Sequence, residues 1–188
     1  MSCLQLPGSF ETFVAMFRGI NVGGKHMLPM KDLVAMFRRA GCPDARAYIH
    51  SGNIVFRARP PVAAQIPALV EKAIAAQHGF SARAVLRTAA ELELVTTNNP
   101  LLGAHTDSGT LHVAFLAELP SPALVAALDP NRSPPDEFAA RGREIYLRCP
   151  NGIARTKLTN QYFDAALSTT STVRNWRTVI KLLELARG

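Results

Sequence analysis

The residues best suited to chemistry lie between Arg18 and Lys25, in the segment RGINVGGK. Its glycines permit a tight turn that exposes backbone N–H groups, and a cation stands at each end. This combination suits an anion such as a phosphate or a carboxylate. A purely structural interpretation stays open beside it, because the same glycines also permit a tight chain path.

The segment also fits the spacing of a nucleotide-binding P-loop, G-x-x-x-x-G-K, from Gly19 to Lys25. The next residue is His26, whereas a P-loop has a Ser or Thr whose hydroxyl binds Mg²⁺. Leu28 and Pro29 also delay the following helix. We therefore expect no nucleotide hydrolysis of the P-loop type.

Two further groups of polar residues lie at predicted helix starts in the second half of the chain. They are Arg155, Lys157 and Asn160 at the first start, and Arg174 and Asn175 at the second. Helix N-termini favour anions, so we expect these side chains to contribute to anion binding. The structural alternative is that Asn175 is an N-cap and Trp176 a core residue.

The first half of the chain has the patterns of an α+β domain. An amphipathic helix starts after Pro29 and ends at Gly41, and Ser51 and Gly52 mark a tight hairpin. The expected elements are strands at 12–18, 46–50, 53–57 and 82–87, with helices at 29–41 and within 62–78. This β-α-β-β-α-β order predicts a ferredoxin-like unit.

The second half repeats the order of elements. The expected elements are strands at 110–117, 136–141, 143–148 and 170–174, and helices from Ser121 to Leu128, at 157–167 and after Asn175. We therefore predict two tandem ferredoxin-like halves with extra helices, at 12–97 and 110–188, connected by a loop at 98–109.

Topology predicts a candidate site in the first half. In a β-α-β-β-α-β unit, the end of the first strand and the turn between the second and third strands lie at the same end of the sheet. The predicted neighbours are Arg18, Asn21, Gly23, Gly24 and Lys25 on the loop, and Ser51 and Asn53 at the hairpin. Alternatively, Asn21 and Asn53 satisfy turn backbone.

Composition limits the classes of function. The formal charge of +7 permits attraction to nucleic acid, nucleotides or anionic surfaces, yet no dense basic block occurs. The sequence lacks the aromatic RNA-binding pattern of RRM domains. It also lacks the metalloprotease motif H-E-x-x-H and the G-x-S-x-G elbow of serine hydrolases.

The three cysteines, Cys3, Cys42 and Cys149, form no metal-ligand or disulfide framework, which indicates a reducing cytoplasm. We expect no secretory signal in the loose segment 1–11 and no membrane span.

Three segments carry a family resemblance: Phe17–Leu33, Tyr48–Phe56 and Pro150–Leu185. They contain FRGINVGGKHMLPMKDL, YIHSGNIVF, and PNGIARTKLTNQYF followed by TVRNWRTVIKLLEL. Together they resemble the bacterial domain-of-unknown-function family 1697. The resemblance implies a tandem of two α+β halves and brings no catalytic residues, cofactor or substrate.

The sequence favours a cytoplasmic protein that binds a nucleotide, a phosphate-bearing metabolite or a nucleic acid. An enzyme acting on a small phosphorylated or carboxylated metabolite in the same site is the alternative. An interaction module without a small ligand is a third hypothesis. No residue pattern identifies a reaction or a cofactor.

Overall fold

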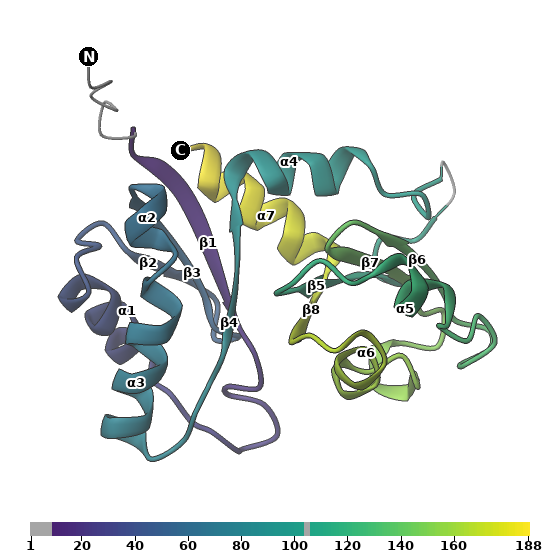
Figure 1. Ribbon diagram of the computed structural model, residues 1–188, viewed down its shortest axis with the longest axis horizontal. Coiled ribbons are helices and arrows are strands. Elements are labelled where there is room, and N and C mark those ends of the chain that lie inside the picture. Colours follow the sequence, from purple (N-terminus) through teal and green to yellow (C-terminus); the bar gives the residue numbers. More distant parts are fainter. Residues whose placement is uncertain (1–8, 104–105) are drawn as a thin grey trace. The chain divides into compact units, whose positions relative to one another are not determined.

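The computed structural model describes residues 9–103 and 106–188. Cys3 and most of the segment 1–11 therefore lie outside the described residues. Contacts divide the chain into a first unit, which comprises residues up to Ala89 together with Leu185–Gly188, and a second unit, Ala90–Glu184. Figure 1 shows that the fold is α+β, as the sequence predicts, with a sheet and packed helices in each unit.

The first unit follows the predicted β-α-β-β-α-β order. Its elements are β1 (Glu11–Phe17), α1 (Met30–Arg39), β2 (Arg46–Tyr48), β3 (Asn53–Ala58), α2 (Pro60–Ala63), α3 (Ile66–His78) and β4 (Ala84–Thr88). The strands form an antiparallel sheet in the order β2-β3-β1-β4, so β1 lies between β3 and β4.

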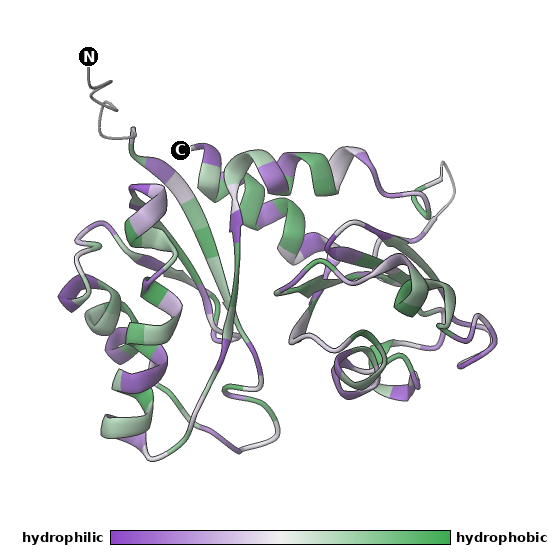
Figure 2. Ribbon diagram, viewed as in Figure 1, coloured by the Kyte–Doolittle hydropathy of each residue, from purple (hydrophilic) through white to green (hydrophobic). Residues whose placement is uncertain are grey.

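Alternating side chains of β1 determine where the first core forms. Phe13, Ala15 and Phe17 face the same side of the sheet and pack with the buried residues of α1 and α3. Phe37 of α1 lies with its ring centroid 5.1 Å from that of Phe56 on β3, which joins helix and sheet. The apolar stretches of these strands are visible in Figure 2.

Two short elements of the first unit differ from expectation. The short helix α2 precedes α3, which itself lies within the expected range 62–78 with Pro67 in its first turn. Gly79 ends α3 with a φ of 75°, the left-handed conformation expected of it. Strand β2 is shorter than expected because Ile49 has a φ of 51° and leaves the extended conformation.

The second unit repeats this arrangement. Its elements are α4 (Ala89–Thr97), β5 (Leu111–Leu116), α5 (Pro122–Ala126), β6 (Glu137–Arg141), β7 (Glu144–Arg148), the 3₁₀ helix η1 (Ile153–Arg155), α6 (Asn160–Leu167), β8 (Ser171–Asn175) and α7 (Trp176–Arg187). Two helix ends, Ala89 of α4 and residues 185–187 of α7, belong to the first unit. The strand order β6-β7-β5-β8 matches that of the first sheet. Phe163 and Leu167 of α6 pack on one face of this sheet, beside Ile145 and Leu147.

Helix caps confirm local predictions in the second unit. Ser121 accepts a hydrogen bond from the N–H of Leu124 at the start of α5. The side chain of Asn175 accepts one from the N–H of Thr178, and Trp176 is buried. Helix α6 begins at Asn160, later than expected, because Thr159 is its N-cap. Among the described residues, no helix is both long and apolar enough to cross a membrane.

Gly52 determines how closely the turn between β2 and β3 approaches β1. It has a φ of 73°, and a Cβ there would lie 2.6 Å from Cδ1 of Ile20 and 2.9 Å from Cβ of Phe17. Gly142, in the turn between β6 and β7, has a similar φ of 60°, but its nearest such neighbour lies at 3.8 Å. A comparison of substitutions at the two glycines therefore distinguishes the cost of the left-handed backbone from the cost of a steric clash.

We predict that Gly52→Ala destabilises the protein by about 2 kcal/mol more than Gly142→Ala. Both variants suffer the left-handed backbone, which costs about 1–2 kcal/mol. Only Gly52→Ala forces the core apart, at a cost of about 1–3 kcal/mol. Urea unfolding of both variants measures the difference, and equal losses of stability would contradict the close approach.

Candidate functional site

The two predicted turns are neighbours. The N–H of Phe17 donates to the carbonyl of Gly52 over 2.8 Å, which joins the end of β1 to the turn between β2 and β3. The side-chain amide of Asn21 also donates to the carbonyl of His50 over 2.9 Å. The glycine-rich loop and the Ser51–Asn53 hairpin therefore lie at one end of the first sheet.

The glycine-rich loop is a small hairpin and not a P-loop. The N–H of Lys25 donates to the carbonyl of Val22 over 3.1 Å, and these two residues form an isolated β-bridge. Gly23 and Gly24 between them have φ angles of 59° and 73°, which is typical of a type I′ turn. Helix α1 begins only at Met30, so the loop does not feed directly into a helix start as a P-loop does.

Asn21 holds this loop against the hairpin. Besides its bond to His50, its amide donates to the carbonyl of Leu28 over 2.9 Å, and its Oδ1 accepts from the N–H of Leu28 over 2.7 Å. Asn53 is fully buried and donates to Oγ of Ser51 over 2.9 Å. The structural interpretation of both asparagines therefore has direct support, since their side chains bond within the turns.

Three cations mark this end of the first unit: Arg18, Lys25 and Arg83, together called the cationic rim. The N–H of Arg18 donates to the carbonyl of Arg83 over 2.9 Å, one step beyond the paired residues Phe17 and Ala84. The two arginines thus lie opposite each other, one residue beyond the paired ends of β1 and β4.

Burial and a neighbouring charge both act on Arg18. Its side chain is half-buried, and desolvation together with the charge of Arg83 lowers the pKa of Arg18. Glu71 offsets part of this charge, since its Oε1 lies 4.0 Å from Nε of Arg83. Lys25 is exposed on the hairpin.

The predicted residues of the second unit have separate surroundings. Arg155 and Lys157 are exposed around η1, whereas the side chain of Asn160 accepts from the hydroxyl of Ser171 over 3.3 Å. Arg174 is buried, and its guanidinium donates to the hydroxyl of Thr172 over 2.8 Å. Burial lowers the pKa of Arg174 to about 10, and Asn175 serves as the helix cap described above.

A repeat at the level of single residues escaped the sequence analysis. Arg87 on β4 and Arg174 on β8 are each the next-to-last residue of the last strand of their sheet, and both are buried. Each donates from Nη1 to the carbonyl of the preceding residue, Leu86 or Val173, over 2.7 and 2.9 Å. The only trace of this repeat in the sequence is an arginine two residues before the start of a helix in each half.

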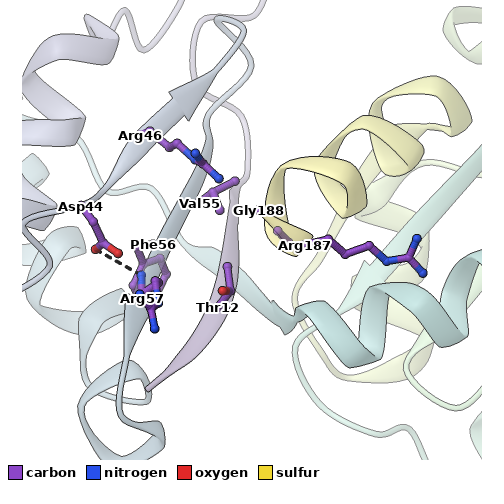
Figure 3. Close-up of a pocket in the computed structure, with 9 residues that line it drawn as sticks. Thr12, Asp44, Arg46, Val55, Phe56, Arg57, Arg187 and Gly188 are labelled. Carbon is purple, nitrogen blue, oxygen red and sulfur yellow. Dashed lines mark hydrogen bonds between the residues drawn. The ribbon is translucent and has the colours of Figure 1, made fainter. Parts of the chain in front are cut away.

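An arginine-lined cavity of about 450 Å³ was also missed (Figure 3). Arg46 on β2 and Arg57 on β3 line it beside Asp44, whose carboxylate accepts from the N–H of Arg57 over 3.3 Å. The guanidinium of Arg46 donates to the carbonyl of Leu185, in the last turn of α7. Arg187 points away from the two other arginines in Figure 3. Helix ends favour such a cation, so Arg46 acts as a cap for α7.

The described residues offer little for nucleophilic or metal chemistry. Burial raises the pKa of the Cys42 thiol and raises that of Cys149 to about 11, which disfavours the reactive thiolate. In the part of the chain that the structure describes, no group of three or more His, Cys, Asp or Glu residues is placed to hold a metal ion.

Comparison with known proteins identifies the family. The model of DUF1697, described as a protein of unknown function, matches residues 10–146. The chain belongs to the DUF1697 family. The predicted resemblance is thus confirmed, although its third segment, Pro150–Leu185, lies beyond the matched range.

A solved structure resembles this DUF1697 chain over most of its length. It is a conserved bacterial protein from Streptococcus pneumoniae, with a TM-score of 0.69 and 21% sequence identity. The alignment covers 95% of the DUF1697 chain and 99% of that protein. At this identity the likeness concerns the fold alone. No curated protein matches the chain.

Replacing Asn21 with Ala should destabilise this DUF1697 protein by about 1–3 kcal/mol, because three hydrogen bonds to the two turns disappear together. Amide exchange at Leu28 should accelerate at the same time. Asn151→Ala, at an exposed position, is the matched control. Unchanged exchange at Leu28 would show that the loop is held by other contacts.

Arg46→Ala should release the last turn of α7, because the carbonyl of Leu185 loses its charged donor. We expect a loss of about 1 kcal/mol, at the low end for a charged hydrogen bond because Arg46 is exposed. Hydrogen exchange of residues 185–187 measures it. Arg57 lines the same cavity, so Arg57→Ala is the control and should leave that exchange unchanged. Equal effects of the two variants would contradict the capping role.

Proposed function

We propose that the first unit binds a phosphate-bearing anionic ligand at the cationic rim. The observation that carries this proposal is the pairing of Arg18 and Arg83 across adjacent strands. Like charges directly opposite on a sheet are destabilising, and an anion between them turns that repulsion into attraction. Guanidinium groups also match phosphate oxygens with paired hydrogen bonds.

The balance of charge at this end supports the proposal. The rim holds three cations, and Glu71, whose Oε1 lies 4.0 Å from Nε of Arg83, offsets part of their charge. Arg18 is half-buried, and partial exclusion of water strengthens its interaction with an anion. Gly23 and Gly24 are exposed at the tip beside Lys25, so no side chain there blocks the approach of a ligand to the backbone.

The other predicted residues have positioning or structural roles in this proposal. Asn21, Ser51 and Asn53 position the rim through their bonds within the turns. In the second unit, Arg155 and Lys157 are exposed cations that can attract an anion to that unit, and Asn160, Arg174 and Asn175 maintain the local structure.

The proposal includes the fold class and the cellular setting. Both halves are ferredoxin-like, which the β-α-β-β-α-β order and the matching strand orders support. The loop at 98–109 then connects the halves 12–97 and 110–188. A cytoplasmic setting accords with the free thiols of Cys42 and Cys149.

Replacing Arg18 with Gln should weaken binding of ribose 5-phosphate by about 10- to 100-fold, since the variant loses a charged hydrogen-bond donor. Lys25→Ala should weaken it less, by about two- to fivefold, because an exposed ion pair contributes little. Isothermal titration at fixed ionic strength measures both affinities.

Two matched variants serve as controls for this experiment. Arg38→Gln and Lys72→Ala remove cations from exposed helix positions of the same unit and should leave the affinity unchanged. Thermal unfolding confirms that each variant is folded. If Arg18→Gln binds as tightly as the controls, the cationic rim is not the site. Turnover of a phosphorylated metabolite would instead support the enzyme alternative.

A further inference from the structure

A stacked pair of rings lies beside the cationic rim. The imidazole of His26 lies over the ring of Phe80, with centroids 4.7 Å apart and planes inclined by 20°. His26 is exposed, and Phe80 covers one face of its ring. The ring centroid of Phe80 lies in turn 6.3 Å from that of His78.

The same contacts place His26 next to the arginines. Nδ1 of His26 lies 3.2 Å from the carbonyl oxygen of Gly19, the residue after Arg18. On the other side of the stack, Phe80 precedes Arg83 by three residues. The aromatic pair and the two opposed arginines therefore come from the same two segments of chain.

The position of His26 is fixed before any ligand arrives. Its φ of 50° is unusual for a residue with a side chain, and its carbonyl accepts a hydrogen bond from the N–H of Asn21 over 3.1 Å. Phe80 holds the ring from one side. A ring held in this way loses little conformational entropy when a ligand stacks on it.

Exposed apolar side chains occur on the loop that carries this ring and on the neighbouring hairpin. Val22 is 64% exposed and Met27 is 62% exposed, both on the loop that carries His26, and Ile49 is 48% exposed on the neighbouring hairpin. A simple inorganic anion makes no use of such a surface. A flat, apolar ring attached to a phosphate uses both the surface and the cations.

We propose that the ligand is a nucleoside phosphate, with its base stacked on the face of His26 opposite Phe80 and its phosphate at the cationic rim. This inference rests on the proposed function, because the phosphate occupies the site described there. Stacking of bases on aromatic side chains beside a positively charged groove is the general mode of single-strand recognition, and it tolerates any base. The ligand is then either a mononucleotide or a nucleotide within a single strand.

Comparison of ribose 5-phosphate with AMP isolates the contribution of the base. Base–aromatic stacking predicts that AMP binds about 5- to 100-fold more tightly than ribose 5-phosphate. His26→Ala should abolish this preference and leave the affinity for ribose 5-phosphate unchanged. His26→Phe retains a stacking ring and should retain the preference. Thermal unfolding verifies that both variants fold.

The outcomes separate the two proposals. If ribose 5-phosphate binds and AMP binds no more tightly, the proposed function stands and the stacking inference is overturned. Failure of both to bind overturns both. A preference for AMP that survives His26→Ala also overturns the inference, because the base then stacks elsewhere.

A short single-stranded oligonucleotide identifies the source of the nucleotide. Affinity that exceeds that of AMP, falls steeply with salt and depends on His26 supports a nucleotide within a single strand, because several phosphates then release counterions. Affinity equal to that of AMP supports a mononucleotide. An oligonucleotide that binds equally well to the wild type and to His26→Ala contradicts stacking on this ring.

Discussion

The candidate site depends on the bridge that the side chain of Asn21 makes between two turns. One amide group connects the carbonyl of Leu28, at the end of the glycine-rich loop, with the carbonyl of His50 in the opposite turn. The left-handed φ of Asn21, 56°, is one that asparagine adopts more readily than most residues. Without this bridge, the loop of the cationic rim loses three hydrogen bonds that hold it in place.

This end of the first unit brings together groups that are unfavourable by themselves. Strand register places Arg18 opposite Arg83, and the hairpin exposes Lys25 beside apolar side chains. Each arrangement costs stability in the free protein, through repulsion in the first case and exposed apolar surface in the second. Unfavourable local features that are held by a rigid surrounding are typical of functional sites.

Much of the fold followed from the sequence because local signals were strong. Gly79 and Asn175 ended or began helices as expected, and topology alone placed the loop beside the hairpin. The site was harder to predict. The pairing of Arg83 with Arg18 depends on strand register, which composition does not reveal. The amide of Asn21 suited a ligand and a turn equally well, and only coordinates could decide between them.

The central claim is that a nucleoside phosphate binds at the cationic rim, and a crystal structure grown with AMP tests it most directly. The account predicts electron density for phosphate between Arg18 and Arg83 and for adenine against His26. Density in the cavity lined by Arg46 and Arg57, with none at the rim, would contradict it.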